Sequence, residues 1–212
     1  KRPEVIRGAE VGEDCAFFSF HENEGVLATT APIVVDEFET IGFELTSIVN
    51  NVAASGGEPV AVMVSAILPD KILESVVQRL SGEMERACRN LNLQIAGGNT
   101  QISKALNKPI LNITVLGKKD KEEHINFHKY EAGQDILLTK WAGLGGTIVL
   151  AKKEQKRLKE RLPGYIVENG IALEKEISVL TESRVAMEVG VSGMHDVSRG
   201  GIFSALWELA EK

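Results

Sequence analysis

The sequence predicts an α+β fold with two domains, and three observations carry that prediction. The composition, 43% hydrophobic and 25% charged, is that of an ordinary globular protein. Segments typical of strands and segments typical of helices follow one another along the chain. A charged stretch at residues 118–133 separates two halves, so we expect an N-terminal domain over residues 1–120 and a C-terminal domain over residues 130–212.

The first quarter of the chain is predicted to form two strands and a helix. Residues 17–20 and 26–35 are rich in apolar side chains and flank the polar turn at residues 21–25, which is typical of neighbouring strands. Residues 40–55 place apolar side chains every three or four positions, and Thr40 can cap the start, so they are predicted to form a helix.

The next segments repeat this order. Residues 60–68 form a short run rich in valine and alanine, which is typical of a buried strand. Apolar residues then recur at helical spacing over residues 72–87. Residues 91–95 are predicted to form an inner strand that two glycines stop, and residues 109–116 alternate as a further strand does.

The second half is predicted to begin with a strand and continue in helices. Residues 135–139 are apolar and β-branched, which favours a strand. A glycine-rich turn follows and leads into a helix that ends near residue 151. Residues 171–189 are predicted to form one long helix, and residues 202–211 another.

Composition and charge exclude several classes of function. A net charge of −6 gives no general attraction to nucleic acid or to an acidic membrane surface. No apolar run is long enough to span a bilayer, and residues 1–7 lack the apolar core of a signal peptide, so we expect a cytoplasmic protein. Cys15 and Cys88 have no metal spacing, and His124 and His128 have no third ligand nearby, so a zinc site is not favoured.

Four short segments combine glycine with amide or acidic side chains. They are residues 12–16, 50–59, 96–100 and 195–201. Any one of them is most simply a tight turn, because glycine, asparagine and aspartate tolerate left-handed backbone there. Their joint occurrence, in this order and at these separations, is what favours a shared functional site.

In that order the segments resemble the nucleotide site of the PurM superfamily. This superfamily includes aminoimidazole ribonucleotide (AIR) synthase, the hydrogenase maturation factor HypE, selenophosphate synthetase and thiamine monophosphate kinase. The chain looks most similar to HypE and to AIR-synthase-related proteins. The resemblance implies a PurM-like N-terminal α/β-sandwich domain, part of a PurM-like C-terminal domain, and a homodimer joined through its N-terminal sheets. Because members of the superfamily continue well past residue 212, and the chain does not begin with methionine, a fragment of something longer is also implied.

The resemblance also implies which residues bind the ligand. Residues near the start of the last helix are expected to hold a phosphate or a substrate, although Ser198 could simply cap that helix and Arg199 could form a surface ion pair. We expect residues 14, 51 and 99 to converge around one hollow. The residues implied to bind nucleotide are Asp14, Thr30, Asn50, Asn51, Gly97, Gly98, Asn99 and Thr100, and those implied to bind phosphate or substrate are Asp196, Arg199, Gly200 and Gly201.

The chain departs from the superfamily in its acidic residues. Of four expected acids only Asp14 is present, while Ala31, Asn51 and Asn99 stand where the others belong. Magnesium prefers oxygen ligands with carboxylates among them. Each lost carboxylate forfeits on the order of 4 kcal/mol of attraction per unit of cation charge, at about 4 Å and an effective dielectric of about 20. ATP is therefore the expected ligand, magnesium is doubtful, and Asp14 is a weak metal ligand at a degenerate site.

Two functions remain open from the sequence. The first is a nucleotide-binding protein with ATP-dependent phosphoryl transfer to a small molecule or a maturation substrate, working as a synthase-like, kinase-like or HypE-like enzyme. The second is a non-catalytic homodimeric module for ligand binding or assembly that has lost this chemistry. Asp36 or Glu37 could replace a missing metal ligand.

Overall fold

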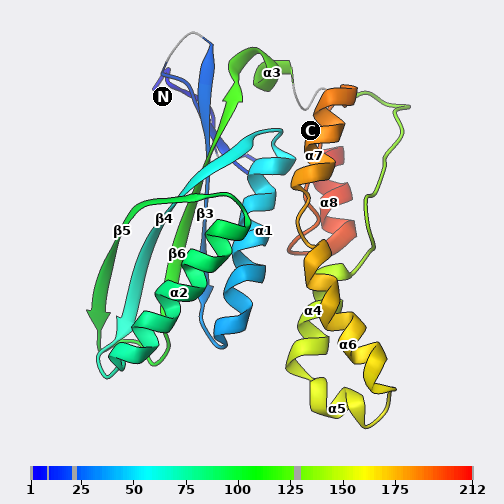
Figure 1. Ribbon diagram of the computed structural model, residues 1–212. Helices are drawn as coiled ribbons and strands as arrows, with labels where there is room; N and C mark the ends of the chain where they lie inside the picture. Colours follow the sequence, from blue (N-terminus) through cyan, green and yellow to red (C-terminus); the bar gives the residue numbers. More distant parts are fainter. Residues whose placement is uncertain (1, 9, 21–22, 127–129, 212) are drawn as a thin grey trace.

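The fold is a six-stranded sheet with helices packed on one of its faces, followed by a helical second half (Figure 1). The computed structural model describes residues 2–8, 10–20, 23–126 and 130–211. All strands of this described part lie before residue 121, and all elements from residue 130 onward are helices. The mixed α+β class predicted from the sequence is confirmed.

The strands of the sheet run in the order β1-β2-β3-β6-β4-β5. Neighbours are antiparallel except β4 and β5, which are parallel and are joined by a helical crossover. The strands are β1 (Val5–Arg7), β2 (Ala16–Phe18), β3 (Glu24–Val34), β4 (Glu58–Pro69), β5 (Gln94–Ser103) and β6 (Ile110–Asp120).

Two helices, α1 (Ile41–Ala54) and α2 (Glu74–Asn90), lie against the same face of this sheet (Figure 1). The inward side chains of both helices and of strands β3, β4 and β6 form one apolar core. The opposite face of the sheet carries no helix among the described residues, and Thr30, Ser65 and Asn112 are exposed there. Fully buried members of the core are Leu27, Ile41, Leu45, Val49, Val52, Val62, Ile113 and Val115.

The second half packs onto the N-terminal half mainly through α7 and α1. Ser183 on α7 is buried, and its hydroxyl donates to the Ala53 carbonyl on α1 at 2.5 Å. No described helix is long and apolar enough to cross a membrane. The remaining helices are α3 (Lys121–Asn126), α4 (Leu144–Lys153), α5 (Gln155–Lys159), α6 (Gly164–Ala172), α7 (Leu180–Val189) and α8 (Gly201–Ala210), with short 3-10 turns η1 (Phe38–Thr40) and η2 (Leu173–Glu176).

The helices and strands of the core were predicted closely, but three other expectations were wrong. Strand β5 does not stop at the glycines, because it runs from Gln94 to Ser103 beside β4. Residues 135–139 form no strand, and Leu137 is 86% exposed there. The long helix expected over residues 171–189 is broken at residues 177–179. Strand β1 and helix α6 were not anticipated.

The two glycines inside β5 face very different surroundings. A Cβ atom on Gly98 would lie 1.9 Å from the Val64 carbonyl oxygen on β4, whereas a Cβ atom on Gly97 would meet nothing within 4 Å. Only a residue without a side chain lets β5 approach β4 this closely at position 98.

We therefore expect Gly98→Ala to lower the free energy of unfolding by about 3 kcal/mol, because the pairing of β4 and β5 must open. Gly97→Ala is the matched control and should change it by less than about 1 kcal/mol. Urea unfolding followed by circular dichroism measures both. Equal effects of the two changes would contradict the close approach of the strands.

Candidate functional site

Side chains from both ends of the chain converge on His195. Asp14 lies in the loop between β1 and β2, Asp196 precedes α8, and Glu208 lies on α8. The His195 Nδ1 atom is 3.6 Å from Asp14 Oδ2 and 3.9 Å from Asp196 Oδ1. Its Nε2 atom is 2.5 Å from Glu208 Oε2. The Asp14, His195 and Asp196 side chains are 13%, 6% and 6% exposed, so the cluster is largely shielded from water.

The backbone before α8 places this cluster. Gly200 and Gly201 both have positive φ, of 84° and 66°, a conformation that other residues rarely adopt. The chain therefore turns sharply into α8, with His195 and Asp196 held just before the helix. On α8 the Ser204 hydroxyl donates to Glu208 Oε1 at 3.2 Å, which orients the carboxylate toward His195.

The surroundings of this cluster carry a concentrated negative charge. Burial raises the pKa of the Cys15 thiol to about 12, and the charges of Asp14 and Asp196 act in the same direction. Burial also raises the pKa of the Tyr130 phenol, with Glu13 and Asp14 adding to the rise. In both cases burial is the larger cause, because it penalises the charged form, and the nearby carboxylates add to it by repelling a further anion.

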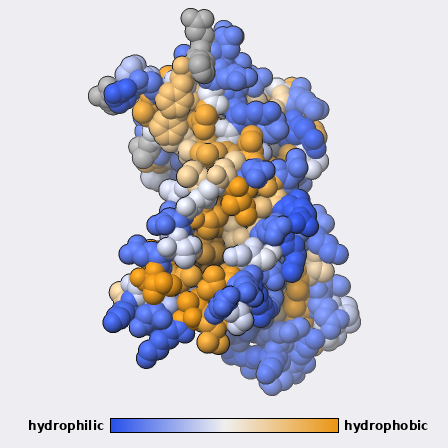
Figure 2. Space-filling view, turned by 60° about the vertical axis from the view of Figure 1, so that its left-hand side comes forward, coloured by the Kyte–Doolittle hydropathy of each residue, from blue (hydrophilic) through white to orange (hydrophobic). Residues whose placement is uncertain are grey.

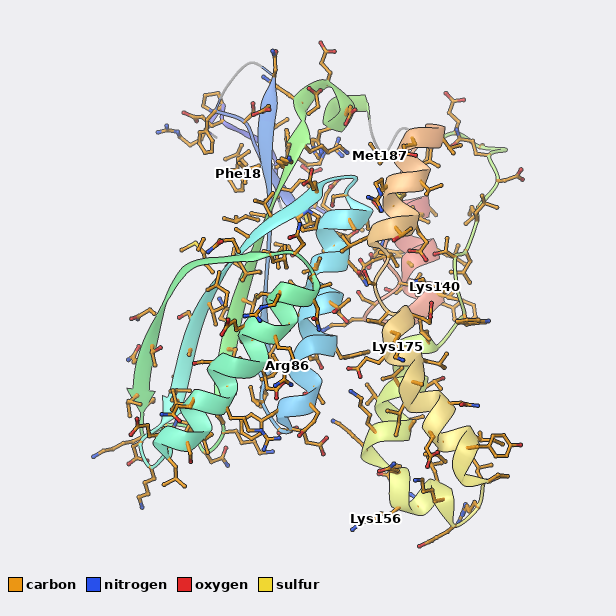
Figure 3. All side chains as sticks on the ribbon, viewed as in Figure 1. Phe18, Arg86, Lys140, Lys156, Lys175 and Met187 are labelled. Carbon is orange, nitrogen blue, oxygen red and sulfur yellow. The ribbon has the colours of Figure 1, made fainter. Side chains whose placement is uncertain are left out.

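A buried lysine lies at the end of α1. The Lys119 side chain donates to the Ser55 carbonyl oxygen at 2.7 Å, where a cation interacts favourably with the C-terminal end of a helix. Burial lowers the pKa of this amine to about 8. A Cβ atom on Gly56 would lie 2.7 Å from the Lys119 amine and 2.8 Å from Met187 Sδ, so α7 closes over the same point. Figure 3 shows Met187 on α7.

Asn50, which was expected to bind nucleotide, joins the two halves of the chain in this structure. It is 7% exposed, and its amide nitrogen donates to the Ile177 carbonyl at 2.8 Å. Its amide oxygen accepts from the Val179 N–H at 3.1 Å. Lys140, labelled in Figure 3, holds the same turn by donating to the carbonyls of Glu176 and Ser178. The turn between η2 and α7 is thus held from two sides.

Asn51 and Thr30, also expected at the nucleotide site, point to different faces of the sheet. The Asn51 amide nitrogen donates to Thr29 Oγ1 at 3.2 Å, on the face that α1 covers. Thr30 is the next residue of β3 and therefore points to the opposite face. There its hydroxyl donates to the Ile113 carbonyl at 3.2 Å and accepts from Thr114 at 3.1 Å.

The residues expected on β5 are also divided between the faces. Asn99 pairs with Ser65, whose exposed side chain lies on the face without helices, while Gly98 pairs with Val64, which packs against the core. Thr100 follows on the helix-covered face by alternation. Asn51 and Asn99 therefore lie on opposite faces of the sheet. The expectation that residues 14, 51 and 99 share one hollow within a single chain was wrong.

Three further candidates are placed clearly. Asp36 does not stand in for a lost acid in this cluster, because its carboxylate is 2.6 Å from the Lys108 amine on the protein surface. Arg199 and Glu37 are exposed. Sequence reasoning missed His195 and Glu208 as members of the cluster. His195 could have been found from the sequence, because it directly precedes Asp196. The contact with Glu208 could not, because it depends on the rotation of α8 about its axis.

Comparisons with known proteins agree with this fold. The model for the N-terminal domain of AIR synthase related proteins matches residues 12–118, and the model for their C-terminal domain matches residues 131–212. The chain is 28% identical to selenide, water dikinase of Pseudomonas putida over 214 residues, covering 99% of this chain and 59% of that protein. It is 23% identical to a putative hydrogenase expression/formation protein of Methanocaldococcus jannaschii, covering 97% and 60%.

Solved structures show the same fold. AaThiL complexed with AMPPCP and TMP has a TM-score of 0.68 at 19% identity, covering 96% of this chain and 65% of that one. HypE of E. coli, a hydrogenase maturation protein, has a TM-score of 0.67 at 20% identity, covering 88% and 57%. The chain spans about 59% of the length of the Pseudomonas putida relative and 60% of the Methanocaldococcus jannaschii one.

The two hydrogen bonds of Asn50 generate a prediction. Asn50→Ala leaves the partly buried Ile177 carbonyl and Val179 N–H without their partner, so the free energy of unfolding should fall by about 2 kcal/mol. Asn51→Ala removes one longer hydrogen bond to a hydroxyl and should cost about 1 kcal/mol. Chemical denaturation measures both changes. A smaller effect of Asn50→Ala than of Asn51→Ala would show that Asn50 does not hold the two halves together.

Proposed function

The chain belongs to the AIR synthase related family, and we propose that it binds ATP, or a closely similar nucleotide, with the phosphates at the start of α8. One observation carries the proposal. Asp14, expected to bind nucleotide, and Asp196, expected to bind phosphate or substrate, both lie within 4 Å of the same His195 nitrogen. The first and last segments of the sequence signature therefore meet at one place in the folded chain.

The start of α8 suits an anionic group. The first N–H groups of a helix have no partner within the helix, and its dipole favours negative charge there. Arg199 lies two residues before the first residue of this helix, is exposed, and forms no hydrogen bond or ion pair with the described residues. A guanidinium in that position can hold a phosphate with two parallel hydrogen bonds. Phosphate binding at this point thus needs no rearrangement of existing ion pairs.

The carboxylate-rich magnesium site of the superfamily does not fit the residues present. Ala31 offers no side-chain ligand atom, and Asn51 offers a neutral amide oxygen in place of a carboxylate. Asn99 lies on the other face of the sheet. The proposed nucleotide site therefore relies on donors such as Arg199 rather than on a cluster of acids around magnesium.

The proposed reaction class is phosphoryl transfer from ATP to a small molecule or a maturation substrate. Support comes from relatives whose names describe a dikinase and from AaThiL, whose structure holds AMPPCP. A non-catalytic assembly module remains the second candidate, favoured by the absence of acids at positions 31, 51 and 99. Turnover of bound ATP separates the two candidates, because only the first predicts it.

Calorimetric titration with ATP tests the nucleotide site. We expect Arg199→Ala to weaken binding about tenfold or more, because two charge-assisted hydrogen bonds are lost. Arg161→Ala removes another exposed arginine, outside this site, and should leave the affinity unchanged. Omitting magnesium should change the wild-type affinity little. The proposal fails if millimolar ATP does not bind, or if both variants bind as the wild type does.

We also propose that a second copy of the chain covers the β4–β5 side of the sheet. Strand β5 is one of the two edge strands of the sheet, and edge strands offer unpaired N–H and C=O groups to another chain. Figure 2 shows a band of hydrophobic residues between hydrophilic margins when this side of the molecule is turned forward. Exposed hydrophobic residues on these two strands are Val60, Met63, Ile95 and Ile102.

Sedimentation equilibrium tests this association. The wild type should have the mass of two chains at micromolar concentration, and Met63→Lys should shift it toward one chain, because a charge would be buried in an apolar contact. Leu73→Lys is the matched control, since Leu73 is also exposed but lies outside the sheet, just before α2. A wild type that stays monomeric at every concentration rules the dimer out.

A further inference from the structure

Lys119 occupies a position on β6 where the alternation of the strand predicts an apolar side chain. Leu111, Ile113 and Val115 alternate along β6 and are buried in the core, and Lys119 continues the same row with only 5% of its surface exposed. Lys118 beside it shows the usual placement of a lysine, with its side chain 64% exposed. Because a buried ammonium costs free energy, an apolar residue at position 119 would stabilise the fold more. The contacts of Lys119 therefore indicate what it does other than stabilise the core.

The Lys119 ammonium lies where the end of α1 meets α7. It donates to the Ser55 carbonyl oxygen at 2.7 Å. Gly56 follows with a φ of 73°, and a Cβ atom there would lie 2.7 Å from the Lys119 amine and 2.8 Å from the sulfur of Met187, which Figure 3 labels on α7. Neither the Ser55 carbonyl nor the Met187 thioether titrates. The ammonium is therefore closely surrounded by uncharged groups of both helices.

The charged groups that act on this ammonium come from other elements. Burial lowers the pKa of the Lys119 amine to about 8, and Arg7 on β1 acts in the same direction. Glu123 on α3 opposes this lowering, as do Glu13 and the Cys15 thiol in the loop before β2. The Glu13 carboxylate is itself 3.0 Å from the Arg7 guanidinium, and its side chain is only 6% exposed. The Lys119 ammonium thus attracts a largely buried carboxylate of the loop.

Ser55 connects the same point to the other side of Asp14. Its carbonyl accepts from Lys119, and its side chain forms a hydrogen bond with the Cys15 thiol. Cys15 follows Asp14 directly, and Glu13 precedes it. Asp14 therefore lies between two residues that interact with Lys119 or with its partner Ser55. The Asp14 carboxylate reaches from there to the cluster before α8.

We propose that Lys119 is a positioning residue, which holds the loop before β2 against the end of α1 and so sets the place of Asp14 in the candidate site. This role rests on the proposed function, since the ligand that Asp14 would contact is the proposed nucleotide. Residues that serve a functional site are commonly not the best ones for stability. Lys119 is such a residue, because its ammonium is unfavourable in the core but attracts Glu13. A neutral side chain of similar length would relieve the core and release the loop.

Alkylation of the two cysteines measures how firmly the loop is held. Cys15 lies in the loop and is 3% exposed, while Cys88 is 1% exposed on α2, so each thiol reacts only when its own segment opens. Lys119→Met should raise the rate of Cys15 alkylation by iodoacetamide about tenfold and leave the rate of Cys88 unchanged. Lys118→Met is the matched control and should change neither rate, because Lys118 forms a surface ion pair with Glu58. Peptide mass spectrometry reads both thiols in one sample.

The urea midpoint of the same variant separates positioning from ordinary core packing. At neutral pH the midpoint of Lys119→Met should be no lower than that of the wild type, because the variant buries no charge. Faster alkylation of Cys15 at an equal or higher midpoint is the expected result. Faster alkylation of both cysteines with a lower midpoint would show a purely structural residue and overturn the proposal, as would an unchanged rate at Cys15.

A pH series on the wild type needs no variant. As the pH rises through about 8, the Lys119 amine loses its proton and no longer attracts Glu13. Once opened, both thiols react with the same intrinsic chemistry, so the ratio of their rates cancels the effect of pH on alkylation itself. The ratio of the Cys15 rate to the Cys88 rate should rise several-fold in the wild type and stay constant in Lys119→Met. A constant ratio in the wild type contradicts the proposal.

Titration with ATP keeps this role apart from the proposed function. Where the wild type binds ATP, Lys119→Met should weaken binding about tenfold, and Lys118→Met should bind as the wild type does. A wild type that binds no ATP refutes the nucleotide site, while alkylation of Cys15 still decides whether Lys119 holds the loop. An unchanged ATP affinity in Lys119→Met, with Cys15 made accessible, would show that Lys119 does not position Asp14 for the ligand.

Discussion

The docking of α7 against α1 is the interaction on which the rest of the structure depends. Asn50 satisfies a carbonyl and an N–H of the turn before α7, and Ser183 donates from α7 back to α1. These hydrogen bonds, together with the packing of Leu180 against the core, fix the helical second half relative to the sheet. Because α7 is held there, the segment leading to α8 returns to the loop before β2, and Asp14 and Asp196 become neighbours. The candidate site around His195 therefore depends on Asn50 and Ser183, although neither side chain is part of that cluster.

The periodicity of apolar residues correctly predicted the helices and strands whose conformation is set by their own sequence. The helix over residues 41–54 and the strands of the core repeat their apolar side chains with a regular period, and one face of each is buried. The predictions of secondary structure were wrong where the conformation depends on residues that are distant in the sequence. The glycines of β5 do not end the strand, because β4 continues beside them to Pro69. Residues 135–139 have the composition of a strand, but no described strand lies beside them to accept their hydrogen bonds.

The candidate site likewise has residues that the sequence could identify and contacts that it could not. Asp14 and Asp196 could be singled out because each lies in a recognisable short motif. The separation of Asn51 and Asn99 could not be foreseen, because it follows from the register of β4 on β5, and a shift of one residue would move Asn99 to the other face. The contact of His195 with Glu208 depends on the rotation of α8, which packing sets and the motif does not. Sequence motifs thus identify candidate site residues. The face of the sheet on which each residue lies, and the residues that it contacts, are set by the tertiary fold.

The charges of the cluster bear on what this chain does in place of the superfamily's magnesium chemistry. Amides at positions 51 and 99 cannot compensate a cation, so the acid that remains, Asp14, would be isolated on the sheet side. It is not isolated, because a histidine and a second acid approach it from the start of α8. Buried carboxylates need a positive charge nearby, whether from a proton, an ion or an arginine. A ligand bound beside Asp14 and Asp196 would contact residues from both halves of the chain, so its binding would be coupled to the way the halves dock.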